Sequence, residues 1–506
     1  MSLSIAWIGT SVAVAAILAW ATSKYLDIPK AHSSLEPPIF ASKVPFVGHI
    51  IGLLVHGLDY YQMMRLPIYT LKMLNGKVYI VTSPELVTAV NRNPKTLAFN
   101  PFIAALGMRI TGHDEPTSQI VQHNLNGEEG SGYVIDVHDS TVLALAPGPN
   151  LEAMLESLLE AVDNYLPHLQ VGEVAEVDFF HWTRRMITMC STRAIYGPSS
   201  PFVEHPEYCD LFWDFDHDLN TLMLNIFPYL LAPKGAKARA TLGIAFQKYF
   251  ENFDQAQGSA MTKARYASNT RYGITPWNQG RLEVGTLIGI LANTIPSVFF
   301  MLAHIYSDPA LLQEVREELE ARSVSVPAIK ISGRTLHAAS LRDKCPLLSS
   351  IWQEILRFHA QGATSRFVRE DVMLDGKYLL KKNMVVQMPM AILHLDPAIW
   401  GDDAGVFRPK RFLEDSCKTA KSTAAYRPFG GGTSLCPGRH FVTLETLALT
   451  AYILLRFDIS PFNGPWAIPT PKQESLATNV FPPGEDIKVK IAKRGGYEDI
   501  EWAFEV

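Results

Sequence analysis

Residues 426–440 read YRPFGGGTSLCPGRH, and this stretch decides how the whole chain is interpreted. Three consecutive glycines precede Cys436, and Gly438 follows it by two residues. Glycine has no Cβ, so such a loop lets backbone amides approach the sulfur, and a helix beginning near Arg439 would direct its positive end towards a thiolate. Cys436 is therefore a candidate for a thiolate stabilised by its surroundings.

The competing interpretation of Cys436 is a buried, inert cysteine after a glycine-rich turn, which is the usual role of a lone cysteine. The four other cysteines have no comparable surroundings, and we expect them to be inert. None of the five stands in a CxxC pair or at zinc-ligand spacing, which excludes a disulfide scaffold and a structural zinc site. These four cysteines are Cys190, Cys209, Cys345 and Cys417.

The composition of the 506 residues narrows the class of protein further. Lys and Arg total 45 against 50 Asp and Glu, and the resulting net charge of −5 gives no basic field for a nucleic acid. With 47% hydrophobic and 19% charged residues, the chain is not disordered and should bury a large core.

The N-terminus has the pattern of a membrane anchor. Residues 1–23 contain no charged side chain, and residues 5–21 approach the roughly 20 apolar residues that span a bilayer as a helix. A cleaved signal peptide, the alternative, requires a basic beginning that is missing here. The lysines that follow the span predict a cytosolic body. The apolar stretch 284–305 carries Asn293, Pro296 and His304, and we interpret it as a long buried helix.

Proline and glycine positions and apolar periodicity predict the elements in the rest of the chain. Residues 24–50 contain several prolines and should form a stiff hinge. An Asn-Gly pair at 75–76 predicts a β-hairpin, and Ser83 followed by Pro84 predicts a helix start. Residues 100–145 suggest a long loop region. The pattern is mainly helical over 150–325 and strand-like over 360–390.

The cysteine loop also carries a family resemblance. Phe429, Gly432, Cys436, Gly438 and Arg439 reproduce the pattern Phe-x-x-Gly-x-x-x-Cys-x-Gly-Arg, and the sequence strongly resembles the membrane-anchored cytochromes P450. The resemblance implies that Cys436 is the axial ligand of a heme b iron and that Phe429 shields its sulfur. The other three residues would complete the cofactor-binding loop.

Two upstream motifs fit the same resemblance. Glu354 and Arg357 match Glu-x-x-Arg, which puts an acid and a base on one face of a helix. Such pairs are common on exposed helices, so the motif gains weight from residues 407–412, FRPKRF, which would deliver Arg411 to the pair. The resemblance implies that these three side chains form a buried charge network with a structural role.

An arginine that follows the Glu-x-x-Arg helix is the candidate for binding a heme propionate. Arg366 stands where the resemblance places this residue, with Arg369 as the substitute. A solvated strand arginine is the alternative interpretation.

The central helix departs from the family pattern of residues that deliver protons to dioxygen. Ala292 occupies the place of the usual acid and Asn293 that of the usual threonine, with Thr294 one position later. These three residues are the catalytic candidates. The alternative for Asn293 is a buried helix polar group that is satisfied by a neighbouring carbonyl and does no chemistry. The Asn-Thr-Ile-Pro run, together with Ser434 in the loop, resembles the subgroup of bile-acid sterol hydroxylases and prostacyclin synthase.

The resemblance as a whole implies a mainly α-helical P450 fold with a small β-rich lobe and an N-terminal transmembrane helix. The expected organisation is an anchor at 1–23, a hinge at 24–50 and a heme-thiolate catalytic domain at 51–506. The expected location is the endoplasmic reticulum membrane, crossed once, with the catalytic domain in the cytosol. The expected activity is hydroxylation or related oxidation of a sterol-like or terpenoid substrate with dioxygen.

Electrons for this reaction would come from NADPH through NADPH-cytochrome P450 reductase, and cytochrome b5 is a further partner that the resemblance allows. The chain itself has no Gly-x-Gly-x-x-Gly dinucleotide fingerprint. Three other functions stay open at this stage. They are a heme-thiolate isomerase or dehydratase that acts on a peroxide without external electrons, a heme sensor or carrier, and a membrane-anchored helical protein without heme.

Overall fold

The computed structural model describes most of the chain as two compact units. The first unit comprises Met1–Phe99 and Ala363–Leu393, and the second comprises Asn100–Gly362 and His394–Val506. The predicted anchor at 1–23 and most of the predicted hinge at 24–50 lie outside the described residues. The structure describes residues 33–506 except 41–48, 50–51, 53–58, 63, 65, 74–75, 167–168, 171, 326–332, 422 and 474–477.

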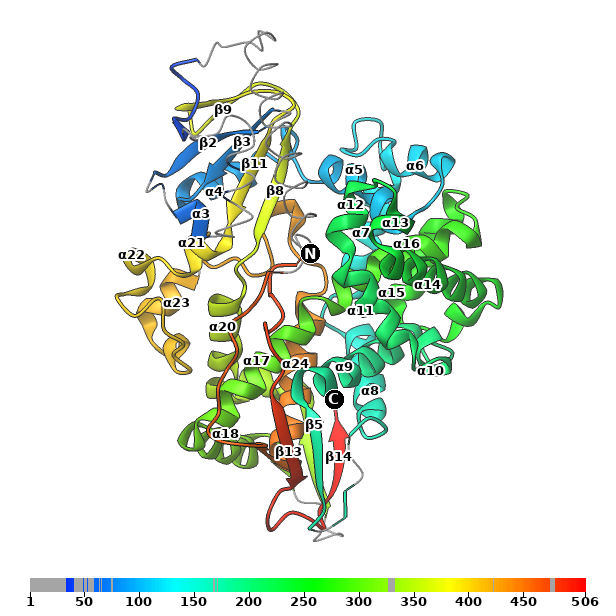
Figure 1. The fold of residues 1–506 in the computed structure, drawn as a ribbon, viewed down its shortest axis with the longest axis vertical. Coiled ribbons are helices and arrows are strands. Elements are labelled where there is room, and N and C mark those ends of the chain that lie inside the picture. The colour runs from blue at the N-terminus through cyan, green and yellow to red at the C-terminus, as the bar shows by residue number, and fades with distance from the viewer. Residues whose placement is uncertain are drawn as a thin grey trace, which may run out of the picture. The chain divides into compact units, whose positions relative to one another are not determined.

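The first unit is built on a mixed six-stranded sheet in the order β1-β2-β3-β11-β8-β4 (Figure 1). Strands β2 and β3 pair antiparallel with Met73 opposite Gly76, which confirms the predicted hairpin, although its two loop residues lie outside the described part. Strand β11 runs parallel to β3 and antiparallel to β8, so distant parts of the sequence lie side by side. The bounds are β1 Ile39–Phe40, β2 Ile68–Met73, β3 Gly76–Val81, β4 Leu97–Ala98, β8 Ala363–Val368 and β11 Val385–Pro389.

Short elements complete this unit. The α4 helix starts where the sequence predicts, because Pro84 stands in its first turn and the Ser83 hydroxyl accepts from Leu86 N at 3.3 Å. The alternation predicted over 360–390 is confirmed by β8, β11 and the antiparallel pair β9 and β10. The remaining bounds are α3 Asp59–Gln62, α4 Pro84–Asn91, β9 Val372–Leu374, β10 Tyr378–Leu380 and α21 Met390–His394.

The second unit is mainly helical, as predicted, and carries two three-stranded sheets in the orders β12-β13-β5 and β14-β7-β6. The last strand of the chain, β14, pairs in parallel with β7 along its whole length. The strand bounds are β5 Val174–Asp178, β6 Val324–Ser325, β7 Gly333–His337, β12 Phe457–Pro461, β13 Lys488–Lys493 and β14 Glu501–Glu505. The helices up to α15 are α5 Asn100–Thr111, α6 Glu115–Gln122, α7 Tyr133–Ala144, α8 Pro149–Val162, α9 Phe179–Tyr196, α10 Pro201–Glu204, α11 Tyr208–His217, α12 Leu219–Leu224, α13 Pro228–Leu231, α14 Pro233–Glu251 and α15 Ala260–Arg271.

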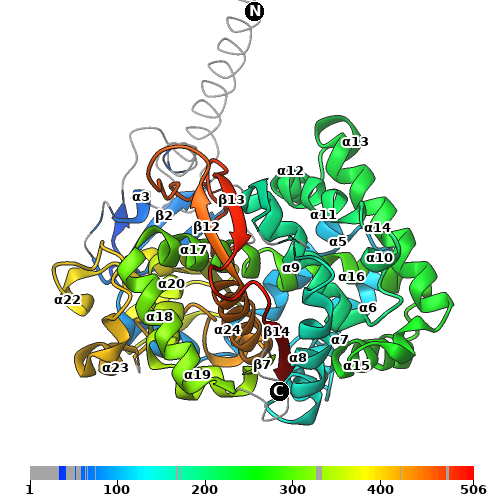
Figure 2. The ribbon, with the colours of Figure 1, turned by 90° about the horizontal axis from the view of Figure 1, so that it is seen from below.

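The core of this unit surrounds a long apolar helical stretch. Among the described residues, only the helical stretch Pro276–Ser307 is long and apolar enough to cross a membrane. Of its most apolar 18-residue segment, 78% is buried inside the protein. The buried helix predicted over 284–305 is therefore confirmed. Its second half, α17, packs against α9, α20 and α24 (Figure 2). The later helices are α16 Pro276–Leu291, α17 Thr294–Ser307, α18 Pro309–Arg322, α19 Leu341–Lys344, α20 Pro346–His359, α22 Pro397–Trp400, α23 Asp415–Lys421 and α24 Arg439–Arg456.

The prediction of a long loop over residues 100–145 is wrong, because the helices α5, α6 and α7 occupy most of this range. The residues that suggested a loop stand at the helix ends. Gly112 separates α5 from α6 at φ +74°, and Gly127 and Gly130 separate α6 from α7, also with positive φ. Asp114 caps α6 by accepting from Thr117 N at 2.9 Å. Residues that end and cap helices are therefore of the same types as residues that form loops.

Candidate functional site

The cysteine loop is a tight turn followed directly by α24. Gly430 and Gly432 have positive φ values of +80° and +61°, in the region that favours glycine. A Cβ on Gly430 would also lie 3.1 Å from the carbonyl oxygen of Ser434. Cys436 N donates to the Phe429 carbonyl at 2.9 Å and closes the turn. The glycines therefore fold the chain back so that the cysteine precedes the helix N-terminus.

The sulfur of Cys436 lies in surroundings unlike those of the other cysteines. All five cysteines are in the described part of the chain, and only Cys436 is partly exposed. Burial raises the pKa of its thiol, while the backbone amides of Gly438 and Arg439 and the positive charge of Arg439 act in the opposite direction. A Cβ on Gly438 would be 3.9 Å from the sulfur. A half-buried thiol with two amides directed at it fits a metal-bound thiolate.

The residues predicted to accompany Cys436 lie with it. Phe429 is partly buried against the main core of the second unit, and Gly432 begins a short 3₁₀ helix, Gly432–Ser434. Gly438 caps α24, whose first residue is Arg439. The Arg439 guanidinium donates from Nη1 to the Cys436 carbonyl at 3.1 Å, which holds the loop against the helix.

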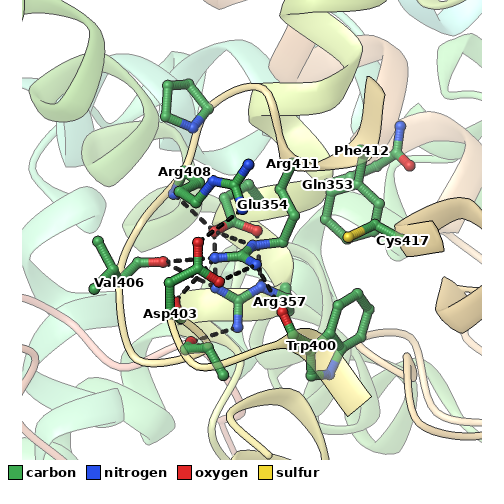
Figure 3. Close-up of polar contacts among 12 residues, drawn as sticks. Gln353, Glu354, Arg357, Trp400, Asp403, Val406, Arg408, Arg411, Phe412 and Cys417 are labelled. Atoms are coloured by element: carbon green, nitrogen blue, oxygen red, sulfur yellow. Dashed lines mark hydrogen bonds and ion pairs between the residues drawn. The ribbon is translucent and has the colours of Figure 1, made fainter. Parts of the chain in front are cut away.

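The predicted charge network is present and fully buried (Figure 3). Arg357 forms a two-point bond with Glu354, from Nε to Oε2 and from Nη2 to Oε1, each at 2.7 Å. Arg411 Nε donates to Glu354 Oε1 at 3.1 Å. The backbone amide of Arg408 donates to the same oxygen at 2.9 Å. The carboxylate of Glu354 is thus surrounded by donors and needs no water.

A fourth member of the network, Asp403, did not stand out in the sequence. Arg411 Nη1 donates to Asp403 Oδ1 at 2.9 Å, and Arg408 Nη1 donates to Oδ2 at 2.7 Å. Hydrogen bonds from Arg411 and Arg408 lower the pKa of Asp403. Burial lowers the pKa of Arg411, but the two carboxylates outweigh it and hold that pKa above its ordinary value. Two acids therefore neutralise the two buried arginines.

Spare donors of the network hold the surrounding backbone. Arg357 Nη1 donates to the carbonyls of His394 and Ala404, at 2.7 and 2.8 Å. His394 donates in turn from Nδ1 to Ala360 O at 2.9 Å and accepts at Nε2 from Arg427 N at 3.1 Å. These two bonds require the neutral ring, and burial lowers its pKa to about 3. Arg427 begins the cysteine loop, so His394 connects the charge network to it, a role that the sequence pattern did not reveal.

The catalytic candidates lie at a break between α16 and α17. Asn293 Oδ1 accepts two backbone hydrogen bonds, from Asn479 N at 2.7 Å and from Val480 N at 3.1 Å. These contacts fix the orientation of the carboxamide, because a flipped amide would present N–H groups to N–H groups. The side chain therefore fastens the segment around residue 479 to the helix break. It does not bond a carbonyl, as the local alternative for Asn293 supposed.

The two neighbours of Asn293 offer no proton-delivering pair. Ala292 is buried and apolar. The Thr294 hydroxyl donates to Ile290 O at 2.8 Å within the helix. Pro296 has no N–H, so the carbonyl of Ala292 loses its helical donor and the helix divides at this point.

Arg366 belongs to the first unit, on β8. It is 2% exposed, and its Nη1 donates to the carbonyl of Ser365 at 2.9 Å. Its guanidinium carbon lies 5.3 Å from the centre of the Phe99 ring. Burial lowers the pKa of Arg366 to about 10, which marks an environment where a charged guanidinium would gain from an anion. Arg369 is a different case, since its Nη1 donates to Lys95 O in an exposed position.

Comparison with known proteins is consistent with this geometry. A family model described as Cytochrome P450 matches residues 286–483. Cytochrome P450 monooxygenase nodJ of Hypoxylon pulicicidum is 32% identical over 93% of this chain and 92% of its own length. Cholesterol 7-alpha-monooxygenase of Cricetulus griseus is 22% identical over 90% of this chain and 93% of its own. The solved structure of retinoic acid bound cyanobacterial CYP120A1 matches the fold with a TM-score of 0.70 at 18% identity, over 91% of this chain and 99% of that one.

Proposed function

The chain belongs to the cytochrome P450 family, and from this premise we propose that it oxidises a sterol-like or terpenoid substrate with dioxygen and NADPH-derived electrons. The family is one of monooxygenases with a heme iron, so the proposal concerns the substrate class, the electron source and the residues involved. Hydroxylation is the favoured reaction. The observation that carries the proposal is the cysteine loop with its half-buried sulfur.

In this proposal Cys436 binds the heme iron through its sulfur. Burial opposes the thiolate, but a metal ion deprotonates a thiol that it binds, and the amides of Gly438 and Arg439 already favour negative charge there. Phe429, Gly432, Gly438 and Arg439 hold the loop around the sulfur. When bound, heme supplies the one-electron and dioxygen chemistry that no amino-acid side chain provides.

Arg366 is proposed to bind a heme propionate. Its lowered pKa reflects a guanidinium held in a poorly solvated place, and a carboxylate partner would reverse that shift. Arg369, the substitute, is supported less well because it is only partly buried and its Nη1 bond to Lys95 O is exposed. The network of Glu354, Arg357 and Arg411 is given a structural role beneath the heme.

The proposed substrate class is supported by the relatives and by the apolar central helix. One relative is named for oxidation of cholesterol, and the fungal relative is named a monooxygenase. The chain would act from the endoplasmic reticulum membrane, anchored by residues 1–23, and would receive electrons from NADPH-cytochrome P450 reductase, with cytochrome b5 as a further donor. Residues 24–50 would form the hinge and residues 51–506 the catalytic domain.

The first test is the reduced, carbon monoxide difference spectrum of the purified protein beside Cys436→Ala. A band near ~450 nm in the parent alone is expected, because a thiolate donates electron density to the iron. Absence of the band from folded, heme-supplied parent would refute the assignment of Cys436. Cys345→Ala is the matched control, since that cysteine is buried and should leave the band unchanged.

A second candidate function is rearrangement or dehydration of a peroxide substrate without external electrons. The helix break favours this function, because the apolar Ala292 stands where an acidic side chain would deliver protons. The Thr294 hydroxyl already donates to the carbonyl of Ile290. Asn293, fixed through Oδ1, would present its amide N–H groups to a substrate oxygen. Conversion of an organic hydroperoxide without NADPH, and no NADPH consumption with sterols in the presence of the reductase, would select this function over hydroxylation.

A further inference from the structure

The imidazole ring of His394 joins three segments of the second unit. His394 ends α21, and its side chain is fully buried. Its Nδ1 donates to the carbonyl of Ala360, the residue that follows α20. Its Nε2 accepts from the backbone amide of Arg427, at the start of the cysteine loop. A neutral imidazole has one donor and one acceptor, so both ring nitrogens are used and the tautomer is fixed.

Three hydrogen bonds of backbone amides lead from this ring to the residue that carries the sulfur. Arg427 N donates to His394 Nε2 at 3.1 Å, and Gly430 N donates to the Arg427 carbonyl at 2.9 Å. Cys436 N donates to the carbonyl of Phe429, the residue before Gly430, also at 2.9 Å. These bonds close successive turns of one short loop. A shift of Arg427 would therefore move Phe429 and the amide of Cys436 with it.

Neighbouring groups hold the ring itself in place. The His394 carbonyl accepts from Nη1 of Arg357, a member of the buried charge network, at 2.7 Å. The ring stacks on that of Tyr426, with centroids 5.8 Å apart, and the Tyr426 hydroxyl donates to Gln353 O at 3.2 Å. Arg427 is only 3% exposed, so water has little access to its amide and would not readily replace a lost acceptor. The ring is thus a fixed support for the beginning of the loop.

We propose that His394 is a positioning residue for the Cys436 sulfur, acting through Nε2 and the backbone of Arg427. This inference rests on the proposed function, because it concerns the geometry of a thiolate that binds the heme iron. Without an acceptor at Nε2, the Arg427 amide would turn towards solvent and the loop would open from its first residues. The sulfur would then lose its alignment with the amides of Gly438 and Arg439, which favour negative charge on it. The Nδ1 bond serves only to orient the ring.

Two amide variants of His394 separate the effects of its ring nitrogens. The amide of His394→Gln lies near the place of Nε2, so its oxygen can accept from Arg427 N. The shorter amide of His394→Asn lies near the place of Nδ1, where it can donate to Ala360 O but cannot reach Arg427. Both amides are neutral, as the buried ring is. Each full-length variant is supplied with heme. Its carbon monoxide difference spectrum is measured per bound heme, together with amide hydrogen exchange at Arg427.

His394→Asn should lower the band near ~450 nm several-fold per bound heme, because the thiolate is no longer held towards the iron. Exchange of the Arg427 amide should become several-fold faster in the same variant. His394→Gln should retain most of the band and slow exchange. The matched control is His304→Asn, which replaces another ring whose pKa burial lowers and whose Nε2 contacts His359 on α20. This control should match the parent in both measurements.

Equal losses of the band in the two His394 variants would overturn the proposal, as would an unchanged band in His394→Asn. Failure of His394→Asn to fold would also overturn it, because His394 would then act on the fold alone. The parent is measured separately, so absence of its band would refute the heme assignment of Cys436. In that case the exchange of Arg427 N in the two variants would still show whether Nε2 holds the loop.

Discussion

The carboxylate of Glu354 is fully buried and accepts four hydrogen bonds, three of them from two buried arginines. A charge in this position is tolerated only because four donors surround the carboxylate and the countercharges lie beside it. Loss of the acid would leave Arg357 and Arg411 with only Asp403 as a countercharge. The cost of removing Glu354 therefore comes mainly from the buried arginine charges that lose their partner, and less from the net attraction within the ion pairs.

Glu354→Ala should destabilise the protein by about 3 to 5 kcal/mol or prevent folding, because it removes one partner of a buried ion pair. Urea unfolding and heme content of the purified variant measure the effect. The matched control is Asp415→Ala, which breaks a pair with Lys418 at the same i,i+3 spacing but on an exposed surface. That change should stay within about 0.5 kcal/mol. A mild effect of Glu354→Ala would contradict the buried-charge account.

Glu445 on α24 is a second buried acid, but its partner is neutral. The Ser191 hydroxyl donates to Glu445 Oε1, and burial raises the pKa of the carboxyl to about 8. In the unfolded chain the same group titrates near its ordinary value of about 4.3. Between about pH 4.3 and pH 8, the folded state therefore keeps a proton on Glu445 that the unfolded state has lost. Stability attributable to the neutral acid is complete below the unfolded pKa and is lost as pH rises through about 8.

Glu445→Gln should remove this alkaline loss, because the amide fills similar space and still accepts from Ser191. Relative to the parent, the variant should gain free energy of unfolding between pH 5 and pH 8.5, by up to about 1.4 kcal/mol for each pKa unit of the shift. Thermal or urea unfolding at several pH values gives the comparison. Parallel pH profiles for the two proteins would show that Glu445 ionises normally.

Among the elements, the central helical stretch is joined to the segment around residue 479 by hydrogen bonds of one side chain, that of Asn293. Asn293 occupies the break between α16 and α17, and its Oδ1 satisfies two backbone donors of a segment far away in sequence. Pro296 creates the break by removing an N–H. The helix and this segment should therefore open and close together.

Asn293→Leu should release the segment, because Asn479 N and Val480 N lose their acceptor, at a cost of about 1 to 3 kcal/mol for each unsatisfied group that stays buried. Faster amide hydrogen exchange at these two residues is the expected result. Asn293→Asp keeps the acceptor and should retain protection. Thr294→Val is the control, since it removes a bond within the helix only. Unchanged exchange in Asn293→Leu would contradict the role given to the carboxamide.

What the sequence could predict in these elements depended on how local the signal was. The Glu-x-x-Arg pair and the glycines around Cys436 act over a few residues, so their spacing reveals them. Asp403 and His394 act on partners distant in sequence, and an aspartate or histidine alone is too common to indicate such a contact. The helices within 100–145 were missed because their capping residues resemble those of a loop. The reach of Asn293 to residue 479 is a tertiary contact, and no local pattern encodes it.

For the whole molecule, three histidines whose pKa values are lowered by burial contribute to an acid limit on stability. Burial lowers the pKa of His304 to about 4 and of His394 to about 3, and lowers that of His359 well below its ordinary value. His304 and His359 contact each other through their Nε2 atoms at 3.1 Å, between α17 and α20. All three stay neutral in the folded state, whereas the unfolded chain protonates them below about pH 6.5. Stability is therefore lost as pH falls from about 6.5.

The free energy of unfolding should decline between pH 6.5 and pH 4.5 by up to about 1.4 kcal/mol per pH unit for each histidine. The double variant His304→Phe/His359→Leu should lower the slope of the free energy of unfolding against pH. The decrease should correspond to about two protons, because two titrating groups are gone. His123→Gln should leave it unchanged, because that ring is exposed. Urea unfolding across this range measures the slope, and an identical slope in the double variant would rule out the pair as its source.

The C-terminal strand β14 makes the end of the chain a part of the fold. Residues 501–505 pair with β7, and the Phe504 ring lies 4.4 Å from that of Tyr452 on α24, the helix that follows Cys436. An affinity tag or a fused reductase domain attached directly to Val506 would begin one residue after a hydrogen-bonded strand. Engineering of this protein at its C-terminus therefore requires a spacer that leaves the strand paired, and a stop codon a few residues early would expose the edge of β7 to aggregation.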